Sequence, residues 1–182
     1  MKKLLLVLLV VAFSGVANAQ DLSFGAKAGV NFATLTGDDV EDIDSRTAFH
    51  LGLVAEFLLS ERFAIQPEVL YSAQGAEDSE ATWKLDYVSI PVMAKFFVTE
   101  GLSLEAGPYV AFNVVSEVEM DGITVDLEEE TESTDFGAAL GLGYQLPMGV
   151  FFQGRYAMGL TDIATDTDAK NGVFQLSVGY KF

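Results

Sequence analysis

The sequence of 182 residues contains no cysteine, a single histidine, and only ten basic residues against 27 acidic ones. The absence of cysteine excludes disulfide bonds, so the fold must be held by hydrogen bonds and packing. The shortage of basic residues argues against nucleic acid as a partner, because an acidic surface repels phosphates. The chain is nevertheless 50% hydrophobic at a formal net charge of −17. Charged and apolar residues must therefore occupy separate regions of the molecule.

Long apolar runs are also scarce, and the clearest one lies near the N-terminus. Lys2 and Lys3 precede an unbroken apolar run at Leu4–Phe13, and Ala17-Asn18-Ala19 forms an A-x-A site. This pattern predicts a secretory signal peptide, residues 1–19, cleaved before Gln20. The run is too short for a spanning helix, which needs about 20 apolar residues. Because no cysteine follows the predicted cleavage site, a lipoprotein is excluded.

Residues 20–182 form one domain by length and contain no segment of helical periodicity. Without the two lysines of the signal peptide, their formal charge is −19. Eight segments alternate apolar and polar residues, which indicates β-strands with one face in an apolar medium. Each is about ten residues long, as a tilted strand needs to cross a bilayer, and an even strand number is the rule in single-chain bacterial barrels. The segments are 22–32, 49–57, 63–72, 88–96, 102–114, 135–145, 150–160 and 174–182.

The connections between these segments are alternately short and long. Outer-membrane barrels have short periplasmic turns and long extracellular loops. The long connections hold 19 of the 27 acidic residues, so negative charge is predicted to gather at the extracellular end. The predicted tight turns are Ser60-Glu61, Thr99-Glu100-Gly101 and Pro147-Met148-Gly149, and the predicted long loops are roughly 34–46, 73–84, 116–134 and 161–172.

The polar face of the strands carries four acidic and four basic residues, which could form an ion path, a proton relay or a structural plug. The interior of an eight-stranded barrel is just wide enough for side chains to fill, and buried charges must pair. The balance of charges favours a salt-bridged plug. Counted outward from the turn at 99–101, Lys95 and Glu105 lie nearly opposite each other and are expected to pair. The eight residues are Glu56, Glu68, Glu105 and Asp135 with Lys27, Lys95, Arg155 and Lys181.

Glycine and proline within the strands have separate interpretations. Nine glycines on the polar face are expected to make space in a narrow barrel, since no helix follows them as a phosphate-binding loop would require. Pro67, Pro91 and Pro108 each remove one ladder donor, so local bulges or water are expected there. The nine glycines are Gly25, Gly29, Gly52, Gly107, Gly137, Gly141, Gly143, Gly159 and Gly179.

Aromatic residues gather at both ends of the apolar face and bracket smaller aliphatic residues. Two such girdles are typical of a barrel in a bilayer, whereas a ligand-binding stripe would cluster in one place. The predicted periplasmic girdle is Phe57, Phe63, Phe96, Tyr144, Phe152, Tyr180 and Phe182, and the outer girdle is Phe32, Phe49, Tyr71, Phe136 and Phe174.

Most of residues 20–182 resembles a family of small eight-stranded outer-membrane barrels, the outer-membrane β-barrel domain or PorT-like family. The last strand, which ends on Phe182, is similar to the C-terminal signature read by the barrel-assembly machinery of Gram-negative bacteria. The resemblance implies an all-β, antiparallel, up-and-down transmembrane barrel in the outer membrane, and it implies little about activity, because the family is defined by its barrel. The segments that carry it are 24–32, 66–71, 87–95, 105–109, 135–143 and 154–160.

Candidate chemistry is sparse. A hydrolase would need to pair His50 with Ser72 or Ser89 and an acid, as in lipid-modifying barrel enzymes of similar size, and the spacing fixes no such triad. Acidic loop residues could share calcium or magnesium weakly, or simply form a solvated rim, and none completes a calcium-loop pattern. We therefore predict no catalytic residue, no cofactor site and no dedicated metal site. The candidate metal-binding acids are Asp38, Asp39, Glu41, Asp42 and Asp44, then Glu128, Glu129 and Glu130, then Asp166 and Asp168.

The leading functional hypothesis is a non-enzymatic outer-membrane barrel with a filled lumen and acidic extracellular loops, serving envelope structure, surface interaction or envelope assembly. Its expected partners are outer-membrane lipid and lipopolysaccharide and the barrel-assembly machinery, and a monomer is expected. One alternative is a membrane-embedded lipid-modifying enzyme or a narrow channel. Another is a soluble exported carrier of an apolar ligand, similar to lipocalins, in which the apolar face would point inward.

Overall fold

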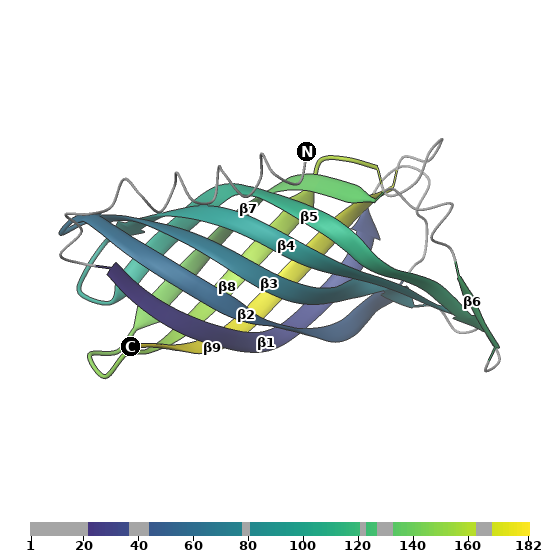
Figure 1. Cartoon of the computed structure of the whole chain (residues 1–182), viewed down its shortest axis with the longest axis horizontal. Coiled ribbons are helices and arrows are strands. Elements are labelled where there is room, and N and C mark those ends of the chain that lie inside the picture. The colour runs from purple at the N-terminus through teal and green to yellow at the C-terminus, as the bar shows by residue number, and fades with distance from the viewer. Residues whose placement is uncertain (1–21, 37–43, 78–80, 121–122, 127–132, 163–168) are drawn as a thin grey trace, which may run out of the picture.

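Neighbouring strands pair antiparallel around a closed ring in the computed structural model (Figure 1). The structure describes residues 22–36, 44–77, 81–120, 123–126, 133–162 and 169–182, so the predicted signal peptide lies outside the described residues. The strands are β1 (Leu22–Thr36), β2 (Asp44–Ser60), β3 (Phe63–Glu77), β4 (Ala81–Phe97), β5 (Leu102–Met120), β6 (Ile123–Asp126), β7 (Thr134–Gln145), β8 (Val150–Gly159) and β9 (Lys170–Lys181).

The ring consists of eight of these strands, as predicted. Each pairs with its neighbour in the order β1, β2, β3, β4, β5, β7, β8, β9, and β9 returns to β1, with Ala28 opposite Val178. The short β6 pairs only with the end of β5, where Met120 faces Ile123. It therefore extends one wall of the barrel beyond the ring (Figure 1).

The tight turns and the end of β9 lie at one end of the barrel, called here the turn end, and β6 lies at the opposite loop end (Figure 1). The three predicted tight turns are confirmed. Two of them use glycines at positive φ, 86° at Gly101 and 91° at Gly149, a conformation that glycine adopts without a Cβ clash.

Several strands run further toward the loop end than the sequence predicted. Most of the expected loop 73–84 is strand, since β3 and β4 remain paired up to Glu77 and Thr82. Residues 117–120 and 123–126, assigned to the third loop, form the β5–β6 hairpin. The hairpin keeps the strand period of two, since Val118 is paired with Val125 and Met120 with Ile123, while Glu117 is paired with Asp126.

The bulges expected at the strand prolines are absent from the described ladders. Pro67 is paired with Val92, and Pro91 with Tyr109. Pro108 of β5 is paired with Ala138 of β7. The register shifts lie elsewhere, between Asp86 and Tyr87 and at two places in the β2–β3 ladder. The ladder thus loses a donor at each proline without changing register.

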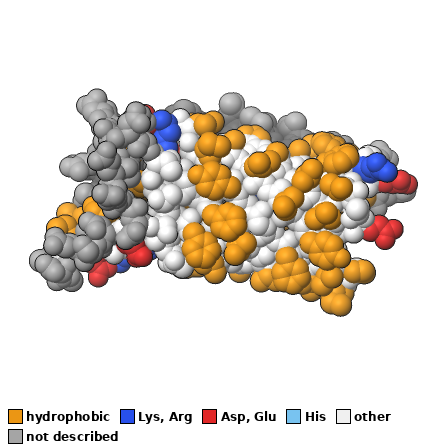
Figure 2. All heavy atoms as spheres, turned by 180° about the vertical axis from the view of Figure 1, so that it is seen from behind, with side chains coloured by type: hydrophobic (Ala, Val, Ile, Leu, Met, Phe, Trp, Pro, Cys, Tyr) orange, Lys and Arg blue, Asp and Glu red, His pale blue; other side chains and the backbone are white. Residues whose placement is uncertain are grey.

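The outer wall carries the apolar side chains. Leu140 and Leu53 are 68% and 66% exposed, and on the visible face hydrophobic side chains cover the wall while charged ones lie at the two ends (Figure 2). Aromatic pairs occur in the predicted outer girdle, with ring centroids 6.4 Å apart for Phe32–Phe174 and 5.9 Å for Phe49–Tyr71. An apolar face that points outward is typical of a barrel in lipid. In a lipocalin-like carrier the apolar face would point inward, so the structure argues against that alternative. No helix among the described residues is long and apolar enough to cross a membrane.

Candidate functional site in the lumen

Seven charged side chains form a continuous chain of alternating sign inside the barrel, called here the ion chain. It runs from Lys181 through Glu56, Lys95, Glu105, Arg155 and Glu68 to Lys27. The N–O distances in that order are 2.6, 2.8, 3.2, 3.3, 2.8 and 2.8 Å. All seven residues are buried, so the predicted salt-bridged plug is present.

The ion chain follows from the topology, because each ring strand places one charged residue in the lumen. Strand β7 contributes no charged residue to the ion chain. Its Gly141 is paired with Glu105 of β5 on one side and with Arg155 of β8 on the other. On the same strand, a Cβ at Gly143 would lie 2.5 Å from a carboxylate oxygen of Glu105. This glycine therefore leaves the space that the Glu105 side chain occupies, as the sequence predicted for the lumen glycines.

The strongest contact in the ion chain joins Arg155 and Glu68. Both Nη atoms of Arg155 donate to the two carboxylate oxygens of Glu68, at 2.9 and 2.8 Å, and one also reaches Glu105 at 3.3 Å. Gln66 donates to Glu68 at 2.8 Å, and Gln153 donates to Glu105 while accepting from Lys27. Buried charges need such complete pairing, because their desolvation offsets much of the Coulomb gain.

Asp135 is buried on the lumen face, as the sequence predicted, but it does not join the ion chain. Its carboxylate accepts from Thr161 at 2.7 Å, Tyr109 at 3.2 Å and Asn171 at 3.3 Å. Asp135 lies six residues, or roughly 20 Å of strand, from Gly141 beside the ion chain. The chain therefore joins four cations and three carboxylates.

The single histidine is held by partners other than the two serines considered in the sequence. His50 is 1% exposed, with Nε2 at 2.8 Å from Ser177 Oγ and Nδ1 at 2.7 Å from Asn31 Oδ1. Ser72 is one step removed, since Asn31 donates to its hydroxyl at 3.0 Å. Ser89 makes no hydrogen bond to His50.

Ser177 was missed by sequence reasoning because its approach to His50 depends on closure of the ring. Gly29 of β1 pairs with His50 on one side and with Ser177 on the other. A Cβ at Gly29 would lie 2.7 Å from His50 Cε1. The absent side chain therefore lets the histidine and the serine meet across β1.

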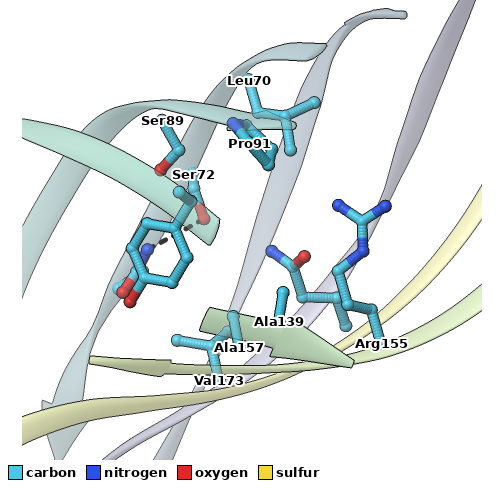
Figure 3. A pocket seen from close by; sticks show the side chains of 11 residues that line it. Leu70, Ser72, Ser89, Pro91, Ala139, Arg155, Ala157 and Val173 are labelled. Carbon is cyan, nitrogen blue, oxygen red and sulfur yellow. Dashed lines mark hydrogen bonds between the residues drawn. The ribbon is translucent and has the colours of Figure 1, made fainter. Parts of the chain in front are cut away.

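Two cavities lie within the described part of the barrel. One of about 20 Å³ lies beside Arg155 (Figure 3), and one of about 820 Å³ lies at the turn end, lined by residues of all three tight turns. No group of His, Asp or Glu side chains that could hold a metal ion occurs in the described part of the chain. Of the candidate metal-binding acids, only Asp44 falls within it, as the first residue of β2.

Comparison with known proteins identifies the fold family. Residues 18–165 match the model of the outer membrane protein beta-barrel domain. The chain belongs to this family. The structure is similar to neisserial surface protein A (TM-score 0.63) and to Ail, the attachment invasion locus protein of Yersinia pestis (TM-score 0.58). Each is 16% identical, and each match covers 90% of this chain and 100% of the other.

A further structure of Ail, with TM-score 0.57 and 16% identity, contains the heparin analogue sucrose octasulfate. No curated protein matches the sequence significantly. Family membership confirms the predicted outer-membrane barrel and its location in the outer membrane. At this level of identity, the likeness to the solved structures shows the fold alone.

Proposed function

We propose that this protein is a non-enzymatic outer-membrane barrel that makes contacts at the cell surface through its acidic loop end. The observation that carries the proposal is the ion chain. It fills the lumen, so the barrel serves as a scaffold and recognition falls to the parts that extend beyond the membrane. Lipid and lipopolysaccharide are the expected neighbours of the apolar wall, and calcium or magnesium could gather weakly at the acidic loops.

The charge of the loop end supports a positively charged partner. Besides the acids of the loop sequences, Glu117 and Glu119 lie on the projecting end of β5, and Asp162 follows β8. Two exposed apolar residues of the β5–β6 hairpin, Met120 and Val125, are 50% exposed each. Sulfated sugars such as the one bound to Ail would be repelled by this end, because like charges oppose binding.

The test compares two charge-neutralised variants of equal size, Glu117→Gln/Glu119→Gln at the loop end and Glu61→Gln/Glu100→Gln at the turn end. With the protein in nanodiscs, polylysine binding should weaken only for the loop-end variant and should fall steeply with salt. Planar bilayers containing the wild-type protein should show no conductance. Equal polylysine binding by the two variants, or open-channel currents, would contradict the proposal.

One observation favours a second candidate, an enzyme acting on lipid. The order Ser177, His50, Asn31 is that of a nucleophile, a base and a group that orients the base. Ser177 is, however, only 7% exposed, and its hydroxyl lies on the lumen face of β9. A fluorophosphonate probe for reactive serines should leave the protein unlabelled, and labelling that disappears in Ser177→Ala would favour the enzyme instead.

A further inference from the structure

A small cavity lies in the middle of the lumen, on the loop side of the ion chain. Its volume is about 20 Å³, and its polar lining consists of Arg155, Ser72, Gln74, Ser89, Tyr109 and Gln175 (Figure 3). A cavity holds a water molecule when its volume exceeds roughly 10–15 Å³ and two to four polar groups face it. This cavity meets both conditions and is too small for any organic ligand.

Arg155 brings an unused hydrogen-bond donor to this cavity. Its two Nη atoms are taken by Glu68 and Glu105, whereas Nε is buried and has no partner among the described residues. Arg155 itself is 2% exposed. Buried polar groups are nearly always hydrogen-bonded. The Nε–H group is therefore expected to donate to an acceptor that is not a protein atom.

The cavity is also where three separate hydrogen-bonded groups of the lumen meet. Arg155 belongs to the ion chain, and Tyr109 belongs to the group around Asp135. The third group surrounds Asn31, which donates to Ser72 and accepts from Gln175. These hydrogen bonds link members within each group, and the cavity is lined by members of all three.

We propose that the cavity binds one internal water molecule that accepts a hydrogen bond from Arg155 Nε–H and joins the three groups into one network. A hydroxyl or amide oxygen of the lining accepts the water's own protons. Water suits this place better than an anion, because Glu68 and Glu105 already neutralise the guanidinium. The side chains on the loop side of the lumen are then oriented by the ion chain through the bound water.

The direct test is nuclear magnetic resonance of the wild-type barrel in nanodiscs. The Arg155 Nε–H signal, assigned by its loss in Arg155→Lys, should show a rotating-frame Overhauser contact with a long-lived water. A crystal structure should show a water within hydrogen-bond distance of Nε. A signal with no water contact would overturn the proposal, and so would a bromide peak at this place after soaking.

A pair of neighbouring alanines supplies the matched control. Ala139 lines the cavity and is 5% exposed, while Ala138 points outward on the same strand. Ala139→Val should displace the water and leave Nε–H without an acceptor, which lowers the ratio of folded to unfolded protein about tenfold or more. Ala138→Val should leave that ratio nearly unchanged. Equal unfolding midpoints, or a persistent water contact in Ala139→Val, would show that the water does not occupy this cavity.

Discussion

Lys95 and Glu105 face each other directly on β4 and β5, and their side chains form an ion pair of 3.2 Å inside the barrel. The sequence predicted this pairing from the turn at 99–101. The structure adds a second partner for each, because Lys95 also contacts Glu56 at 2.8 Å and Glu105 also contacts Arg155. The pair is therefore an interior link of the ion chain.

Glu105→Ala should destabilise the barrel by about 3–5 kcal/mol, because it leaves the buried cations Lys95 and Arg155 short of a counter-charge. Glu119→Ala is the control, since the Glu119 side chain is 43% exposed and solvent screens exposed ion pairs, which therefore contribute little to stability. Urea unfolding of the two variants in the same detergent measures the difference. Equal midpoints would mean that Glu105 is not in a buried pair and that the inside and outside faces are reversed.

Double variants distinguish an isolated pair from a link in a chain. An isolated pair would tolerate exchange of the two charges. Here the exchange places a carboxylate beside Glu56 and an ammonium beside Arg155, so Lys95→Glu/Glu105→Lys should remain strongly destabilised. The neutral Lys95→Met/Glu105→Gln should be more stable than Glu105→Gln alone, because it also removes the cation that lost its counter-charge, while Lys181–Glu56 and Arg155–Glu68 stay paired. Recovery by the charge exchange would argue for an isolated pair.

The sequence predicted the local features of the fold well, because alternation decides which face of a strand meets lipid. The eight lumen charges and the three tight turns were all placed correctly. Contacts across the barrel were not predictable in the same way. Arg155 and Glu68 are 87 residues apart, and Ser177 reaches His50 only because β9 closes on β1. The hairpin at 117–126 was missed although its residues alternate, because each paired segment has only four residues and the two carry acidic residues, which are depleted in strands.

Two glycines next to Leu176 should differ in how much stability the protein loses when each is replaced by alanine. A Cβ at Gly29 would lie 1.9 Å from the Leu176 carbonyl oxygen, whereas at Gly154 it would meet only Leu176 Cδ2 at 3.7 Å. Gly29→Ala must shift β9 or the His50 ring, and it should lower the free energy of unfolding by about 1–3 kcal/mol, as overpacking of an interior does. Gly154→Ala should change stability by less than about 0.5 kcal/mol. Comparable losses in both would contradict the lumen packing described here.

The exposed pair Lys84–Glu119 on the projecting strands should respond to pH and salt. Lys84 lies 2.5 Å from the Glu119 carboxylate, and its hydrogen bond and charge hold the pKa of Glu119 below its usual value. A lowered carboxyl pKa contributes stability above the pKa of the unfolded chain, and that contribution is lost as the pH falls through the folded pKa. A carbon-13 titration should show the lowered pKa, and Lys84→Met or 1 M salt should return it toward the usual value. An unchanged pKa in Lys84→Met would mean that the pair does not form in solution.

The orientation of the barrel can be tested with single cysteines, because the natural sequence has none. Met120 at the end of β5 is 50% exposed, and Met148 in a tight turn is 69% exposed, at opposite ends of the molecule. Short turns face the periplasm in outer-membrane barrels. A membrane-impermeant maleimide applied to intact cells should therefore label Met120→Cys and spare Met148→Cys, and permeabilised cells should be labelled at both. Protection of Met120→Cys together with labelling of Met148→Cys on intact cells would reverse the orientation. The acidic loop end would then face the periplasm, and the proposed contact with partners outside the cell would fail with it.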